Sequence, residues 1–216
     1  MSLVVERVIE QMGLDRLLSD DGFHYNPRQG VLYNPAQTRI CLLSTDLLSG
    51  VHRALEDEAG EAWTVILKSC GQTWGSRLAR RLDRELQTLG GTTLGDTPIG
   101  QLSQSLQRYF GFHGWGDLTL QLDLAQTRGV LQAELRDSIF AEVIRESSLP
   151  VDCMLAGILA SLFSYLSQHS LDCLQTACTT QGAAVSRFVI TSPERTARAR
   201  ELLEQGVSHQ ELVESI

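Results

Sequence analysis

An alternation of apolar and polar residues between positions 118 and 135 constrains the fold of this chain more than any other feature. Leucines alternate with polar residues from 118 to 124, and a second apolar run follows Gly129 over residues 130–135. A period of two places the apolar side chains on one face of a strand, and a glycine between two such runs is typical of a hairpin. The segment therefore predicts two antiparallel strands with one buried face.

Most of the remaining sequence has helical periodicity. Apolar residues recur at three- and four-residue steps over residues 45–55, 62–89, 99–110, 139–145 and 151–166, and a polar helix is expected after Ser192. The double glycine at 90–91 is expected to end the longest helix, and Pro98 to begin the next. Turn residues predict two further strand pairs, over residues 31–43 and over residues 172–191 around Gly182.

These hairpins lie between groups of helices and do not alternate with helices one for one. That order favours an α+β fold, with an antiparallel sheet built of hairpins and packed with helices. The length of 216 residues suits a single domain. We expect an N-terminal amphipathic helix within residues 1–22 that is a candidate dimer element, a main domain over residues 23–192, and a helical tail over residues 193–216.

Charge and composition exclude several classes of protein. The net charge of −8 and pI near 5.1 argue against a nucleic-acid-binding surface. A basic group, with arginines at 77, 80, 81 and 84, is interleaved with acidic residues, so we interpret it as a solvated helix face, with a docking surface as the alternative. No apolar run reaches the roughly 18 residues of a membrane span, and no export signal is seen. Five cysteines without regular spacing fit a reducing compartment, so a cytoplasmic protein is expected.

Three short segments follow one another in a characteristic order. The first begins with Gly-Trp-Gly at 114–116, continues through the hairpin and ends with Asp-Ser-Ile-Phe-Ala-Glu at 137–142. The second is Cys-Met-Leu-Ala-Gly at 153–157, and the third runs from Gln175 to the Ser-Arg-Phe at 186–188. Together these segments resemble the vinyl-4-reductase domain family, a small-molecule-binding module also found in the sensor portion of aromatic-responsive transcription activators. The resemblance extends over about residues 30–191.

The resemblance places the family's zinc ligands at Cys153, Gln175, Cys178 and Ser186. Zinc requires thiolate, imidazole or carboxylate donors, and a neutral amide and an un-ionised hydroxyl are poor substitutes. We therefore predict a degenerate metal site without structural zinc, in which the two cysteines are small buried apolar residues. On one continuous strand Cys173 and Cys178 would point to opposite faces, so Cys173 is expected to be incidental.

The resemblance also implies a ligand cavity among the helices and the hairpin. A pocket for a planar apolar molecule needs aromatic walls and one or two polar groups. For Phe110 and Phe112, ordinary core packing is the competing interpretation. His113 is a surface or core histidine, a hydrogen-bond donor or a ligand for a pigment's magnesium. The candidate ligand-binding residues are Tyr109, Phe110, Phe112, His113 and Trp115, with Trp74 from the long helix.

These features favour a non-catalytic binding protein. No Gly-x-Ser-x-Gly elbow, metalloprotease helix or hydride-donor site is seen. Within the resembled family, tetrapyrrole metabolism and photosystem assembly in photosynthetic bacteria fit a chain without an attached DNA-binding or ATPase segment. The expected ligand is a chlorophyll-type pigment or a bilin, with thioether formation at a cysteine as a minor alternative. Expected partners are a homo- or heterodimeric related chain and photosystem assembly factors, at the periphery of photosynthetic membranes. A tetrapyrrole-modifying enzyme that reduces a vinyl group and a scaffold without ligand are the alternatives.

Overall fold

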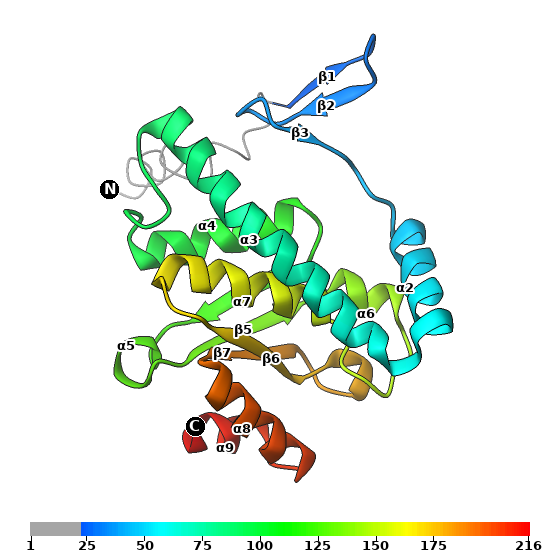
Figure 1. The fold of residues 1–216 in the computed structure, drawn as a ribbon, viewed down its shortest axis with the longest axis vertical. Coiled ribbons are helices and arrows are strands. Elements are labelled where there is room, and N and C mark those ends of the chain that lie inside the picture. Colours follow the sequence, from blue (N-terminus) through cyan, green and yellow to red (C-terminus); the bar gives the residue numbers. More distant parts are fainter. Residues whose placement is uncertain (1–22) are drawn as a thin grey trace.

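The structure, a computed structural model, describes residues 23–216 and centres on a four-stranded antiparallel sheet (Figure 1). Its strands occur in the order β4 (Asp117–Gln121), β5 (Leu131–Arg136), β7 (Ser186–Thr191) and β6 (Asp172–Ala177). Neighbouring strands are antiparallel throughout, and both hairpins predicted for this part of the sequence are present. The predicted α+β fold class is confirmed.

Helices cover both faces of this sheet (Figure 1). On one face lie α3 (Trp63–Gly90), α4 (Ile99–Phe112) and α7 (Cys153–Ser167), and on the other lie α8 (Pro193–Glu204) and α9 (His209–Ser215). The remaining helical elements are α2 (Thr45–Ala59), η3 (Gly60–Ala62), α5 (Ala125–Arg128), α6 (Ile139–Val143) and η4 (Thr179–Gln181). None of the helices within residues 23–216 combines the length and the apolarity needed to cross a membrane.

Strand β7 shows how the sequence specifies this layered arrangement. Phe188 and Ile190 belong to the large core beneath α3, α4 and α7, whereas Val189 belongs to a second core beneath α8 and α9. Successive side chains of a strand point to opposite faces, so an apolar run buries both faces of a central strand. The C-terminal helices therefore complete the sheet by covering its second face.

Helices α3 and α7 cross at unusually short range because glycines stand at the crossing. A Cβ atom on Gly157 would lie 2.2 Å from the carbonyl oxygen of Lys68, and one on Gly71 would lie 2.0 Å from the carbonyl oxygen of Met154. Such distances leave no room for a side chain, so the two backbones touch directly. This crossing brings the start of α7 against the N-terminal half of α3.

A small three-stranded sheet precedes α2 and is formed by β1 (His24–Asn26), β2 (Val31–Tyr33) and β3 (Arg39–Ile40). It is attached to α3 by buried polar contacts, in which Glu85 Oε1 accepts hydrogen bonds from Asn34 Nδ2 at 3.2 Å and from Thr38 Oγ1. The predicted hairpin over residues 31–43 is therefore present, but its second strand is shorter and a first strand precedes it. The predicted N-terminal helix within residues 1–22 lies outside the described residues.

Two local predictions are corrected. The alternating run that begins at Leu118 leaves the sheet after Gln121, because the chain enters α5 before Gly129 turns it back into β5. Cys173 and Cys178 do not share a continuous strand, since β6 contains an irregularity between Gln175 and Ala177 and ends there. Both of these thiols are buried.

Candidate functional site

Two of the four predicted metal-site positions lie together in a buried corner. Gln175 on β6 and Ser186 on β7 are 6% and 0% exposed, and both contact Asp152, the residue before α7, which is 0% exposed. Ser138, the N-cap of α6, contacts the same carboxylate. We call Asp152, Ser138, Gln175 and Ser186 the polar corner.

The carboxylate of Asp152 accepts a hydrogen bond from each of the other three side chains of the polar corner. Its Oδ1 accepts from Ser138 Oγ, and its Oδ2 accepts from Gln175 Nε2 at 2.9 Å and from Ser186 Oγ at 2.6 Å. The amide nitrogen of Asp152 in turn donates to Gln175 Oε1 at 2.9 Å. Burial raises the pKa of Asp152, and the three hydrogen bonds oppose that rise.

The two cysteines of the predicted metal site make contacts other than metal ligation. Cys153 Sγ lies 3.1 Å from the carbonyl oxygen of Pro150, and Cys178 Sγ lies 3.1 Å from Thr180 Oγ1. Burial, followed by the negative charge of Asp152, raises the pKa of Cys153 to about 12, so this thiol keeps its proton near neutral pH. Within residues 23–216, no three His, Cys, Asp or Glu side chains are grouped so that they could hold a metal ion. The donor set does not fit zinc.

The six predicted aromatic positions form one connected cluster. The ring centroid of Trp115 lies 4.8 Å from that of Trp74, 5.0 Å from that of Phe110 and 5.2 Å from that of His113. Tyr109 and Phe112 contact His113 with centroid distances of 4.1 and 5.6 Å. The end of α4 and the loop after it therefore place five of these rings next to the sixth on α3.

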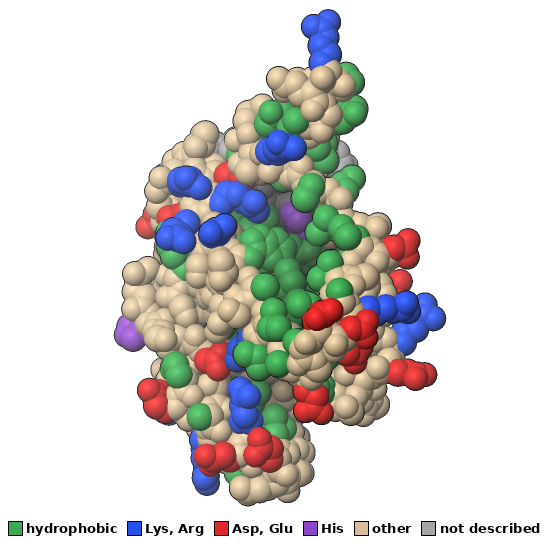
Figure 2. Space-filling view, turned by 45° about the vertical axis from the view of Figure 1, so that its right-hand side comes forward, with side chains coloured by type: hydrophobic (Ala, Val, Ile, Leu, Met, Phe, Trp, Pro, Cys, Tyr) green, Lys and Arg blue, Asp and Glu red, His purple; other side chains and the backbone are tan. Residues whose placement is uncertain are grey.

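Members of this aromatic cluster differ in exposure. Tyr109 and Phe110 are 3% and 1% exposed and belong to the core. For Phe110 this agrees with the alternative interpretation of ordinary core packing. Phe112 is 45% exposed, His113 is also exposed, and both tryptophans are half-buried. On the face that carries α2 and α3, hydrophobic side chains gather in a hollow beside a group of Lys and Arg side chains (Figure 2). The outer rings of the cluster are therefore accessible to a ligand, whereas the inner two form its support.

Electrostatics around His113 favour its neutral form. Partial burial lowers the pKa of His113, and its Nδ1 lies 2.8 Å from the carbonyl oxygen of Tyr109. Because a carbonyl oxygen only accepts, Nδ1 carries the proton and Nε2 keeps its lone pair. Burial likewise raises the pKa of Tyr109, whose hydroxyl accepts a hydrogen bond from Arg81 Nη2 at 3.1 Å.

A basic depression adjoins the aromatic cluster at Trp74. It has a volume of about 720 Å³ and is open on one side. Arg77, Arg80 and Arg84 are exposed, as predicted for a solvated helix face, but the side chain of Arg81 is only 27% exposed and contacts Tyr109. The lining residues are Trp74, Arg77, Leu78, Arg80, Arg81, Asp83, Arg84 and Tyr165.

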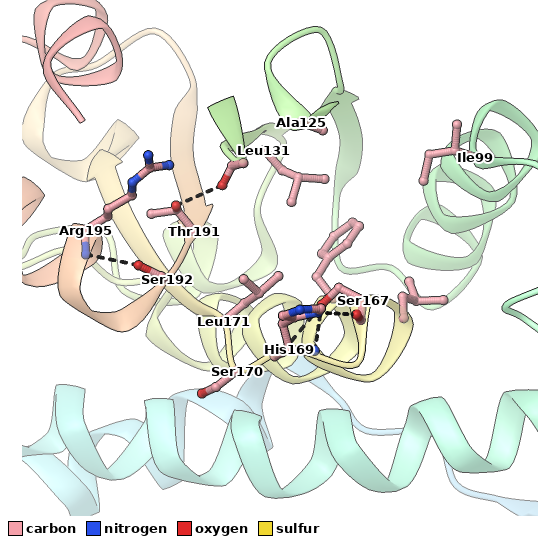
Figure 3. Close-up of a pocket in the computed structure, with 13 residues that line it drawn as sticks. Ile99, Ala125, Leu131, Ser167, His169, Ser170, Leu171, Thr191, Ser192 and Arg195 are labelled. Atoms are coloured by element: carbon pink, nitrogen blue, oxygen red, sulfur yellow. Dashed lines mark hydrogen bonds between the residues drawn. The ribbon is translucent and has the colours of Figure 1, made fainter. Parts of the chain in front are cut away.

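A second cavity of about 580 Å³ lies near the C-terminal end of α7 and is lined by none of the predicted site residues (Figure 3). Apolar side chains such as Phe163 and Leu171 line it, with a polar side formed by residues such as Thr191, whose Oγ1 donates to the carbonyl oxygen of Gly129 at 2.9 Å. The full lining is Ile99, Ala125, Gly129, Leu131, Phe163, Leu166, Ser167, His169, Ser170, Leu171, Thr191, Ser192 and Arg195. These residues come from several separate segments, so no local pattern in the sequence marks them.

Sequence comparisons identify no relatives. No protein-family profile matches the chain. No curated protein matches it either. The vinyl-4-reductase resemblance is therefore without support from sequence comparison.

Solved structures, in contrast, match the fold. The phenol-responsive sensory domain of the transcription activator PoxR, solved with phenol, has a TM-score of 0.64 and 20% identity over 84% of this chain and 89% of that domain. Subunit 3 of a trafficking protein particle complex from Naegleria fowleri, covalently bound to palmitic acid, has a TM-score of 0.50 and 13% identity over 68% and 93% of the two chains. A vinyl-4-reductase family protein from Methanocaldococcus jannaschii has a TM-score of 0.48 and 15% identity over 70% and 83%. The chain thus has the fold of the PoxR sensory domain, which confirms the predicted likeness of fold to aromatic-responsive sensor domains.

Proposed function

We propose that this chain is a non-catalytic protein that binds a hydrophobic planar small molecule against the outer rings of the aromatic cluster. The observation that carries this proposal is that Trp74, Phe112, His113 and Trp115 form one accessible aromatic surface beside an arginine-lined depression. Aromatic faces bind planar apolar molecules by stacking, and a few polar groups fix their orientation. The fold shared with the phenol-responsive PoxR domain supports the same class of function.

Tetrapyrroles combine the chemical features that this surface would recognise. Chlorophyll-type pigments without their phytyl chain, and bilins, are large planar conjugated molecules that carry carboxylates. The exposed guanidinium groups of Arg77, Arg80 and Arg84 lie beside Trp74 and would pair with such carboxylates. Neutral His113 would present Nε2 to a central magnesium, since its other ring nitrogen donates to a backbone carbonyl, as is usual for metal-binding histidines. The corresponding physiological role would be pigment handling or photosystem assembly.

Titration of the purified protein with chlorophyllide a or biliverdin tests this proposal. We expect a shift of the visible absorption band together with quenching of tryptophan fluorescence. Replacing Trp74 with leucine is expected to weaken binding about tenfold, because one stacking face contributes about 1.4 kcal/mol. The control is Trp63→Phe, because Trp63 is 2% exposed and pairs with His52 outside the cluster. An unchanged spectrum with both pigments would contradict the proposal.

Replacing Arg80 and Arg84 with alanine tests the proposed role of the arginines. The double variant is expected to lose affinity for biliverdin severalfold and to show a weaker dependence of affinity on salt, since exposed ion pairs are screened. Arg198→Ala serves as the control, because this arginine is 63% exposed on α8 and pairs with Glu201. Equal affinity and equal salt dependence in wild type and double variant would exclude carboxylate recognition at this depression.

The cavity near the C-terminal end of α7 supports a second candidate site. Its apolar walls and polar side suit a smaller aromatic molecule, and the PoxR domain is described with phenol. Leu166→Trp would fill part of this cavity, whereas Trp74→Leu would leave it unchanged. A phenol affinity that responds to the first variant and not to the second would place binding at this cavity.

A further inference from the structure

The polar corner joins four elements that are distant in the sequence. Ser138 caps α6 by accepting from the amide nitrogens of Phe140 and Ala141, while Asp152 precedes α7. Gln175 and Ser186 belong to the neighbouring strands β6 and β7. A single carboxylate therefore connects two helix starts to the sheet.

Hydrogen bonding within this corner is saturated. Gln175 uses both ends of its amide, since Oε1 accepts from the amide nitrogen of Asp152 and Nε2 lies within 3.3 Å of three acceptors, Asp152 Oδ2, Ser186 Oγ and the carbonyl oxygen of Ala177. No atom of the corner is among the buried polar atoms that lack a partner in the described part of the chain. A metal ion at Gln175 and Ser186 would have to displace these bonds. Both of these side chains are neutral donors, and the carboxylate of Asp152 beside them already accepts three hydrogen bonds.

We propose that the polar corner performs the structural task of a metal ion and that the protein folds without zinc. The residues present here thus differ from the zinc ligand set that the resemblance implies, and they form a hydrogen-bonded network at those positions. Two of the positions that the resemblance assigns to zinc ligands, Gln175 and Ser186, carry hydrogen-bond donors, and the buried carboxylate of Asp152 accepts from both. A fully satisfied buried network is expected to fix the relative positions of the elements it joins.

Gln175→Glu distinguishes a corner held by zinc from one held by hydrogen bonds, because it introduces the carboxylate of the resembled family with almost no change in shape. In a zinc site this change would strengthen binding. In the polar corner the change removes the Nε2 donor to Asp152 Oδ2. It places a carboxylate oxygen in the position of Nε2, which lies 2.9 Å from Asp152 Oδ2, so two like charges would meet. We expect the melting temperature of this variant, measured in EDTA at pH 7.5, to fall by roughly 10 °C. Gln104→Glu, on the exposed side of α4, is the control and should change it by no more than about 2 °C.

Wild-type protein completes the test. After expression in zinc-supplemented medium it is expected to contain far less than one zinc per chain by elemental analysis, and its melting temperature is expected to be the same with and without EDTA. Stoichiometric zinc, or a melting temperature that falls in EDTA, would overturn the proposal whether or not the Gln175→Glu variant folds. Equal stability of Gln175→Glu and wild type in EDTA would overturn it as well.

Discussion

Replacing Gly157 with alanine is expected to lower the free energy of unfolding by at least about 3 kcal/mol. The added Cβ would lie 2.2 Å from the carbonyl oxygen of Lys68 and 2.7 Å from the amide nitrogen of Gln72, and both are backbone atoms inside α3. A flexible side chain could move aside, but a helix backbone cannot move without shifting the whole crossing of α3 over α7. Urea denaturation followed by circular dichroism measures the effect.

Gly50→Ala is the matched control for this prediction. Gly50 is exposed in the interior of α2, and a Cβ there would meet no atom within 4 Å. Alanine in a helix is favoured over glycine by about 0.5–1 kcal/mol, so this variant is expected to be slightly more stable than wild type. Equal stabilities of the Gly157→Ala and Gly50→Ala variants would show that the helix crossing relaxes easily, contrary to the structure.

Local patterns account for the parts of the fold that the sequence predicts well. The helical stripe that precedes Gly91 and the strands flanking Gly129 follow from periodicity and turn residues within a few positions. The sequence does not predict the short α5, because Leu122 and Leu124 continue the apolar–polar alternation beyond the end of β4. Alternation reports which residues are apolar, but the point at which a strand leaves its partner depends on pairing, and β5 pairs with β4 only as far as Gln121.

The candidate sites show the same limit. Five of the six aromatic positions lie within residues 109–115, so their proximity could be predicted locally, and only Trp74 required the tertiary structure. Asp152 could not be found in this way, because an acidic residue before a helix is ordinarily interpreted as a cap. Its partners Ser138, Gln175 and Ser186 lie 14, 23 and 34 residues away and are brought to it by helix placement and strand pairing.

Replacing Asp152 with alanine is expected to lower the free energy of unfolding by about 3–5 kcal/mol, the other large effect expected for this chain. The hydroxyls of Ser138 and Ser186 and the amide nitrogen of Gln175 would lose their common acceptor at a site closed to water. Each buried donor left without a partner costs about 1–3 kcal/mol, and re-pairing between Gln175 and Ser186 would recover part of the loss. Chemical denaturation at pH 7.5 measures the total.

Asp152→Asn keeps the shape of this side chain but reduces the number of hydrogen bonds that it can accept. Asparagine keeps one oxygen for Ser138, but its NH₂ group would face the donors of Gln175 and Ser186. We therefore expect the free energy of unfolding to fall by about half as much as in Asp152→Ala. Asp123→Ala, at an exposed position before α5, should change stability by no more than about 0.5 kcal/mol. If Asp152→Ala were as mild as Asp123→Ala, another contact would have to hold α6 and α7 against the sheet. Because Ser138 also caps α6, a loss of structure confined to that helix would instead show that the corner acts through the cap.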